Sequence, residues 1–111
     1  MPYDEELAFR LRARLETIDG ITDKRMFGGL AFLLHGNMLV AASSKGNLML
    51  RVDPEKADEL LERPHVVPME MGGGRKPKGW LRVEEPGYER DEDLQGWIDL
   101  CLYYVRTLPP K

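Results

Sequence analysis

Ten residues, from Met71 to Trp80, combine three consecutive glycines with three cations and end on a tryptophan (MGGGRKPKGW). A glycine-rich loop can surround a phosphate with backbone amides when its Gly-Lys pair is followed by Ser or Thr. No such pair is present here, since Gly79 is followed by Trp80, and Pro77 stands where a dinucleotide fingerprint begun at Gly72 needs a glycine. We therefore predict a solvated connection before a strand, because loops lie on the surface by default.

The residue types that bind metals or act as nucleophiles are sparse. His35 and His65 lie in separate turn regions, and neither has a second histidine or a cysteine at ligand spacing. Cys101 falls on the apolar face of an expected helix, where a thiol behaves as a small inert hydrophobe. The acids that begin at Asp91 resemble the start of a calcium loop, but Leu102 occupies the position of its bidentate glutamate. We predict no catalytic residue, no cofactor and no metal site.

Length and composition indicate an ordinary globular chain. Its 111 residues are 42% hydrophobic and 32% charged, which suits a single folded domain over residues 1–111. The single cysteine and the absence of a leader-like or long apolar segment predict a cytoplasmic protein with no membrane contact. A net charge of -3 argues against nonspecific nucleic-acid binding, which needs clustered cations.

The elements that must position any site can be read from the hydrophobic periodicity. Asp4 is suited to cap a first helix that ends at Gly20, and Arg10 and Arg14 border its apolar stripe, where we predict solvated side chains. The stripe repeats at helical spacing through Leu7, Leu11, Leu15 and Ile18.

Antiparallel strands are predicted over residues 23–52, because short apolar runs alternate there with turn formers. Residues 30–34 are apolar on both faces and are therefore expected in the middle of the sheet. A second helix is predicted from Asp53-Pro54 to Arg63. Pro68 marks an edge strand, a further strand begins at Trp80, and a last helix begins at residue 91. The fold class is α+β.

One stretch in this series resembles a known family. Arg25-Met26-Phe27-Gly28-Gly29 and the apolar strand after it resemble the signature of the TfoX (Sxy) N-terminal domain family. The resemblance extends over the acidic first helix, the Gly36-Asn37 hairpin, the Asp53-Pro54 helix and the Lys78-Gly79-Trp80 segment. It implies an α-β(3)-α-β(2)-α fold with a mainly antiparallel sheet, in which the last of these segments leads into a late strand. The two consecutive glycines are expected to form a tight turn or bulge.

The same resemblance implies a regulatory role. The full-length family members are regulators of natural competence in bacteria, carry a second, helical domain, and are thought to assist a cyclic-AMP-responsive transcription activator. The present chain resembles a stand-alone single domain of this kind, and the resemblance implies no catalytic residue that could be assigned here.

Our leading hypothesis is a noncatalytic protein-interaction module, in a transcription- or competence-related role. Lys24 and Arg25 beside Phe27 form a candidate cationic lip for an acidic protein partner, and Phe9 is a candidate exposed apolar group. Leu100 and Tyr103 are predicted on the outer side of the last helix, so self-association into a homodimer is an alternative to a separate partner.

Two other functions are kept open. The first is a small-ligand or enzymatic domain whose pocket is lined by aromatic residues such as Phe27 and Trp80. The second and weaker alternative is direct nucleic-acid binding through the loop cations Arg75, Lys76 and Lys78.

Overall fold

The first helix begins where a capping residue is predicted. In the computed structural model, which describes residues 4–26, 28–43, 47–70, 74 and 76–111, α1 spans Glu5–Leu15. The Asp4 carboxylate accepts a hydrogen bond from the Leu7 N–H at 3.1 Å, which satisfies a donor that the helix cannot pair internally. The helix ends before the predicted Gly20, because the Ile18 N–H already bonds back to the Leu15 carbonyl in a tight turn.

Four antiparallel strands follow: β1 (Ile21–Met26), β2 (Gly29–Leu34), β3 (Asn37–Ala42) and β4 (Leu48–Arg51). The family resemblance implied three strands in this part of the chain. The additional one is β1, whose four central residues are exposed and polar, so it carries no hydrophobic signature and is defined by its pairing with β2. The predicted central position of residues 30–34 is confirmed, since β2 lies between β1 and β3.

The turn between β2 and β3 contains two residues, and both have positive φ. His35 has φ 50° and Gly36 has φ 86°, and Leu34 pairs directly with Asn37 across the turn. Two-residue turns with positive φ at both positions match the right-handed twist of the strands that they join.

The chain then leaves the sheet and returns to its far edge. Asp53 caps a short 3-10 helix, η1 (Pro54–Lys56), through the Glu55 N–H at 2.9 Å, and α2 (Ala57–Leu60) continues from it. The predicted helix start is confirmed, but regular helix ends at Leu60 rather than Arg63. Strands β5 (Val66–Pro68) and β6 (Trp80–Val83) follow, then a further 3-10 helix, η3 (Glu85–Gly87).

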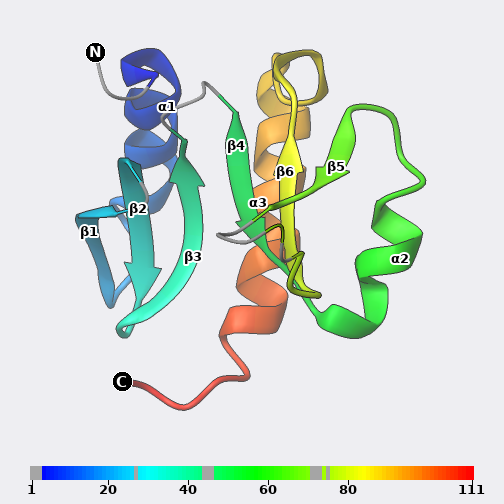
Figure 1. Ribbon diagram of the computed structural model, residues 1–111. Helices are drawn as coiled ribbons and strands as arrows, with labels where there is room; N and C mark the ends of the chain where they lie inside the picture. Colours follow the sequence, from blue (N-terminus) through cyan, green and yellow to red (C-terminus); the bar gives the residue numbers. More distant parts are fainter. Residues whose placement is uncertain (1–3, 27, 44–46, 71–73, 75) are drawn as a thin grey trace.

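The six strands form one antiparallel sheet in the order β1-β2-β3-β4-β6-β5 (Figure 1). β6 inserts between β4 and β5, so β5 becomes the edge strand that Pro68 predicted. This topology places Met49 of β4 opposite Arg82 of β6, and Arg51 opposite Trp80.

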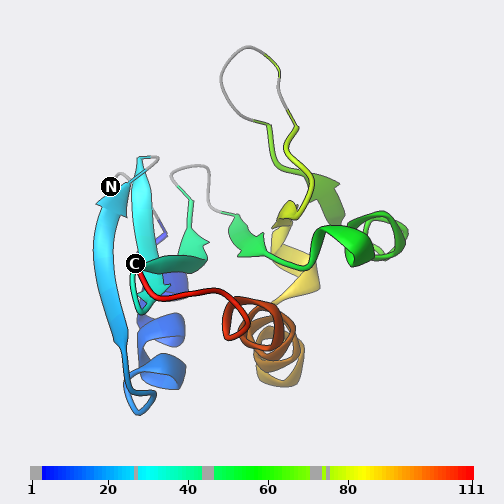
Figure 2. The same ribbon diagram turned by 90° about the horizontal axis from the view of Figure 1, so that it is seen from below.

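The last helix, α3 (Asp91–Val105), packs with α1 on one side of the sheet, as Figure 2 shows. Together they enclose the main core, whose members include Leu7, Leu11, Phe32, Leu50, Leu81, Trp97 and Ile98. The predicted apolar face of this helix is confirmed, whereas Leu100 is half-buried against the core rather than turned outward. None of the helices in the described ranges is long and apolar enough to cross a membrane.

The residues after α3 cross to the β2–β3 turn (Figure 2). There the Lys111 N–H donates to the His35 carbonyl, and the Asn37 side-chain amide donates to the Pro109 carbonyl, each at 2.8 Å. Asn37 is only 3% exposed, so this bond satisfies a polar group that would otherwise be costly to bury. The C-terminal segment is thus part of the fold.

Candidate interaction surface

The face of the sheet opposite α1 and α3 carries a second apolar cluster. Its members are contributed by strands and by the residue that follows β5, and four of the six methionines of the chain belong to it. We call this surface the methionine face; it consists of Met26, Ala31, Leu33, Met38, Ala41, Met49, Met69 and Trp80.

No helical residue in the described part of the chain contributes to the methionine face. The buried residues of α1, α2 and α3 belong instead to the main core on the other side. Met26, Leu33 and Trp80 are only partly buried and give the surface its accessible portion. Methionine side chains are unbranched and adaptable, and surfaces rich in them accommodate partners of varied shape.

Cations stand at strand positions on this same face. Residues paired directly across an antiparallel ladder share a face, and successive residues alternate. Lys24 pairs with Ala31 and Arg82 pairs with Met49, so both belong to the methionine face. Arg51 pairs with Trp80 and joins them. The six strands contain one acidic residue, Asp23, which pairs with Phe32 on the opposite face.

The two arginines are held without an acidic neighbour. The Arg51 guanidinium stacks 5.2 Å from the centre of the Trp80 ring. The Arg82 Nε is buried and has no hydrogen-bond partner among the described residues. An unsatisfied buried donor of this kind costs about 1–3 kcal/mol. No ion pair joins either guanidinium to a carboxylate in the described ranges.

The structure separates the two cations of the predicted lip. Lys24 and Arg25 are both exposed, but they are consecutive in β1 and therefore project from opposite faces of the sheet. Arg25 pairs with Leu30, a residue of the main core, and stands on the helix side. Of this pair, Lys24 alone belongs to the methionine face. Phe27 and Arg75 lie outside the described residues.

The remaining predicted site residues are not brought together with this surface. Lys76 is exposed on the connection between β5 and β6. Lys78 is exposed as well and forms an ion pair with Asp58 at 3.6 Å between Nζ and Oδ2. Phe9 is 70% exposed on α1, on the other side of the sheet, and Tyr103 on α3 is 74% exposed.

The two glycines of the signature have different structural reasons. Gly28 has φ 74°, a conformation that side-chain-bearing residues rarely adopt. At Gly29 the constraint is space: a Cβ there would lie 2.1 Å from the carbonyl oxygen of Ala42 in β3. The predicted tight turn is confirmed, since Met26 pairs directly with Gly29 across it.

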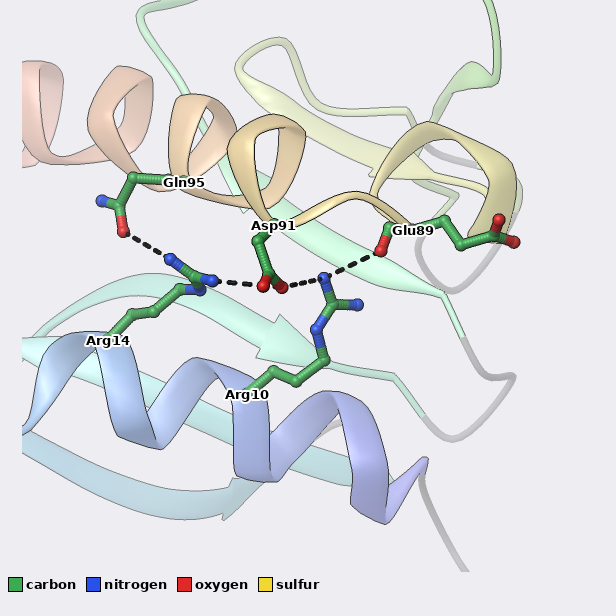
Figure 3. Close-up of polar contacts among 5 residues, drawn as sticks. All are labelled: Arg10, Arg14, Glu89, Asp91 and Gln95. Carbon is green, nitrogen blue, oxygen red and sulfur yellow. Dashed lines mark hydrogen bonds and ion pairs between the residues drawn. The ribbon is translucent and has the colours of Figure 1, made fainter.

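Arg10 and Arg14 join the two long helices rather than border them as solvated groups. Both guanidinium groups lie 3.1 Å from the same Asp91 oxygen at the start of α3 (Figure 3). Arg10 also donates to the Glu89 carbonyl, and Arg14 donates to the Gln95 side chain, each at 3.1 Å. The Arg10 hydrogen bond, followed by the charge of Arg14, lowers the pKa of Asp91. The equal four-residue spacing of the arginines and of their partners on α3 is a signal that sequence reasoning missed.

Groups with a displaced pKa lie away from the methionine face. Burial raises the pKa of the Cys101 thiol to about 12, and burial together with the charge of Asp4 raises that of Tyr88 to about 12. Both residues belong to the main core. Within the described ranges, His, Cys, Asp and Glu side chains form no group of three or more that could hold a metal ion.

A pocket of about 210 Å³ lies elsewhere, between α3 and the η1–α2 segment. It is lined by Val52, Asp53, Lys56, Leu60, Leu100, Tyr103 and Tyr104. A second hollow, of about 280 Å³, lies between α1 and β1.

Comparison with known proteins gives one match. The family model of the TfoX N-terminal domain matches residues 13–104, a range that begins within α1, ends within α3 and includes all six strands. Neither the curated proteins nor the solved structures contain a match to this chain. Because the matched range covers most of the 111 residues, the chain belongs to the TfoX N-terminal domain family.

Proposed function

We propose that this domain is a noncatalytic protein-interaction module with a regulatory role, and that it holds its partner on the methionine face. The observation that carries the proposal is an apolar sheet face to which no described helix contributes, with cations that have no acidic neighbour. Membership of the TfoX N-terminal domain family supports a role in transcription or competence regulation.

The distribution of charge indicates what kind of partner this face suits. Lys24 stands at the β1 end of the sheet, and Arg51 and Arg82 stand on the central strands β4 and β6. Because the strand positions of this face hold no carboxylate, an acidic partner would be attracted and a basic partner repelled. The partly buried side chains of Met26, Leu33 and Trp80 would supply the apolar contacts.

Neighbouring residues of β1 provide a matched pair of variants. Lys24→Glu and Arg25→Glu make the same reversal of charge at consecutive exposed positions, but only Lys24 belongs to the methionine face. Tagged wild type and both variants would be used to capture proteins from the host lysate, with mass spectrometry as the readout. We expect Lys24→Glu to weaken capture of the partner several-fold while Arg25→Glu leaves it unchanged, since reversal of a rim charge affects mainly association.

Circular dichroism of each variant would show that the domain is still folded. Equal capture by wild type and Lys24→Glu, or equal loss with both variants, would contradict binding through the methionine face. Recovery of the domain's own chain as the captured protein would identify the partner as a second copy.

A small-ligand function is the second candidate, and the pocket beside α3 is the observation in its favour. Its volume of about 210 Å³ is below the usual range for small-molecule sites, about 300–1,000 Å³, but suits a single ring. Amide shifts of Leu100 and Tyr104 during a fragment screen by NMR would support it, and no shift with any fragment would count against it. Direct nucleic-acid binding gains no support, since Lys78 pairs with Asp58.

A further inference from the structure

Two arginines occupy diagonal positions on the methionine face. Arg51 of β4 pairs with Trp80, and two residues away Met49 pairs with Arg82 of β6. Diagonal positions on one face of an antiparallel pair are about 7–8 Å apart, which long side chains can span. The two guanidinium groups can therefore approach one bound group from adjacent strands.

Both groups have unused capacity to bind an anion. No described carboxylate forms an ion pair with Arg51 or Arg82, although five ion pairs are formed elsewhere by other cations. Arg51 is oriented by its stacking on the Trp80 ring, and the Nε–H of Arg82 is a buried donor without an acceptor in the described part of the chain. A ligand oxygen would supply the acceptor that the fold does not.

We propose that Arg51 and Arg82 bind a side-chain carboxylate of an extended acidic peptide, whose neighbouring apolar side chains contact Met49 and Trp80. The inference rests on the proposed function, because it names the chemistry of the partner on the same face. A carboxylate has two oxygens in one plane, which match the fork of a guanidinium. An extended peptide carries acidic and apolar side chains within one short segment, as a surface of mixed arginine and methionine requires.

The surroundings favour a carboxylate over a phosphate. The positions beside the arginines are occupied by Met49, Trp80 and Met69 rather than by polar groups. A doubly charged phosphate would have to lose more hydration than a carboxylate to enter apolar surroundings, and stripping an ion of water is costly unless every oxygen is paired.

The test uses three synthetic peptides that alternate leucine with glutamate, glutamine or phosphoserine. Isothermal titration calorimetry would give their affinities, and the Arg82 Nε–H resonance in a ¹H–¹⁵N spectrum would report on the site itself. We expect the glutamate peptide to bind about 10- to 100-fold more tightly than the glutamine peptide and to shift that resonance downfield. Arg82→Lys should remove most of this difference, because lysine lacks the planar fork, and Arg25→Lys on the other face should preserve it.

Several results would overturn the inference. Equal affinity for glutamate and glutamine peptides, tighter binding of the phosphoserine peptide, or an unmoved Arg82 resonance would each do so. No binding of the glutamate peptide at millimolar concentration would also reject it. Any of these could occur while capture still differs between Lys24→Glu and Arg25→Glu, in which case the interaction module would stand and the acidic peptide would not.

Discussion

The second glycine of the signature offers a sharp test of the fold, because the space around it is filled by backbone. A Cβ on Gly29 would lie 2.1 Å from the carbonyl oxygen of Ala42, and 3.1 Å from both the carbonyl carbon of Ala42 and the Cα of Ser43. Backbone atoms of a paired strand cannot rotate aside as a flexible side chain can. In Gly29→Ala the end of β3 must therefore move away from β2, close to the Leu30–Ala42 pair.

The expected cost follows from this displacement. Inserting a methyl group into a well-packed site typically costs about 1–3 kcal/mol, and the rigid obstacle here places Gly29→Ala near the upper end. Reduced freedom of the unfolded chain offsets about 0.4–1 kcal/mol of this. The net loss is about 2–3 kcal/mol, which corresponds to a decrease of roughly 10 °C in Tm for a domain of this size.

Urea denaturation followed by circular dichroism would measure the change, with Gly96→Ala as the matched control. Gly96 lies within α3, and a Cβ there would meet nothing within 4 Å. The same substitution should therefore stabilise the domain by about 0.5–1 kcal/mol through helix propensity. A Gly29→Ala variant within about 0.5 kcal/mol of wild type would refute the steric argument, because surface changes without steric conflict fall in that range.

Two further predictions concern the packing of the helices. Trp97→Phe removes an indole N–H that donates to the Gly87 carbonyl at 2.9 Å and shrinks a side chain that is 4% exposed. We expect it to lower the free energy of unfolding by about 2–4 kcal/mol in guanidinium titrations, and an unchanged midpoint would contradict the assignment. Arg10 and Arg14 hold the pKa of Asp91 below its usual 3.8, so its carboxylate stabilises the fold above that pH, and this contribution is lost as the pH falls through the lowered pKa. The stability difference between wild type and Asp91→Asn should therefore shrink from about pH 6 to about pH 3, and a constant difference would contradict it.

Local sequence signals account for most of the elements. Asp4 and Asp53 cap the helices that they were expected to begin, and Pro68 lies in an edge strand. These predictions hold because capping and the loss of a proline N–H depend on a few neighbouring residues. Strand β1 is different, since its exposed residues follow no apolar pattern and its pairing with β2 is a tertiary property.

The candidate surface was only partly predictable. Alternation along a strand was sufficient to place Lys24 and Arg25 on opposite faces, and that signal was available in the sequence. The neighbourhood of Arg51 and Arg82 was not, because it depends on β6 inserting beside β4 instead of pairing with β5 alone. Likewise, the contact of Arg14 with Asp91 joins residues far apart in the chain, which local periodicity does not bring together.

The placement of the two tryptophans on opposite sides of the sheet gives the domain two separate optical reporters. Trp97 lies in the main core and Trp80 lies on the methionine face, partly accessible to solvent. Intrinsic fluorescence should therefore contain a component sensitive to unfolding and another sensitive to occupancy of the methionine face. In a Trp97→Phe background, Trp80 becomes the single indole fluorophore of the chain, so its emission can report binding without an added dye.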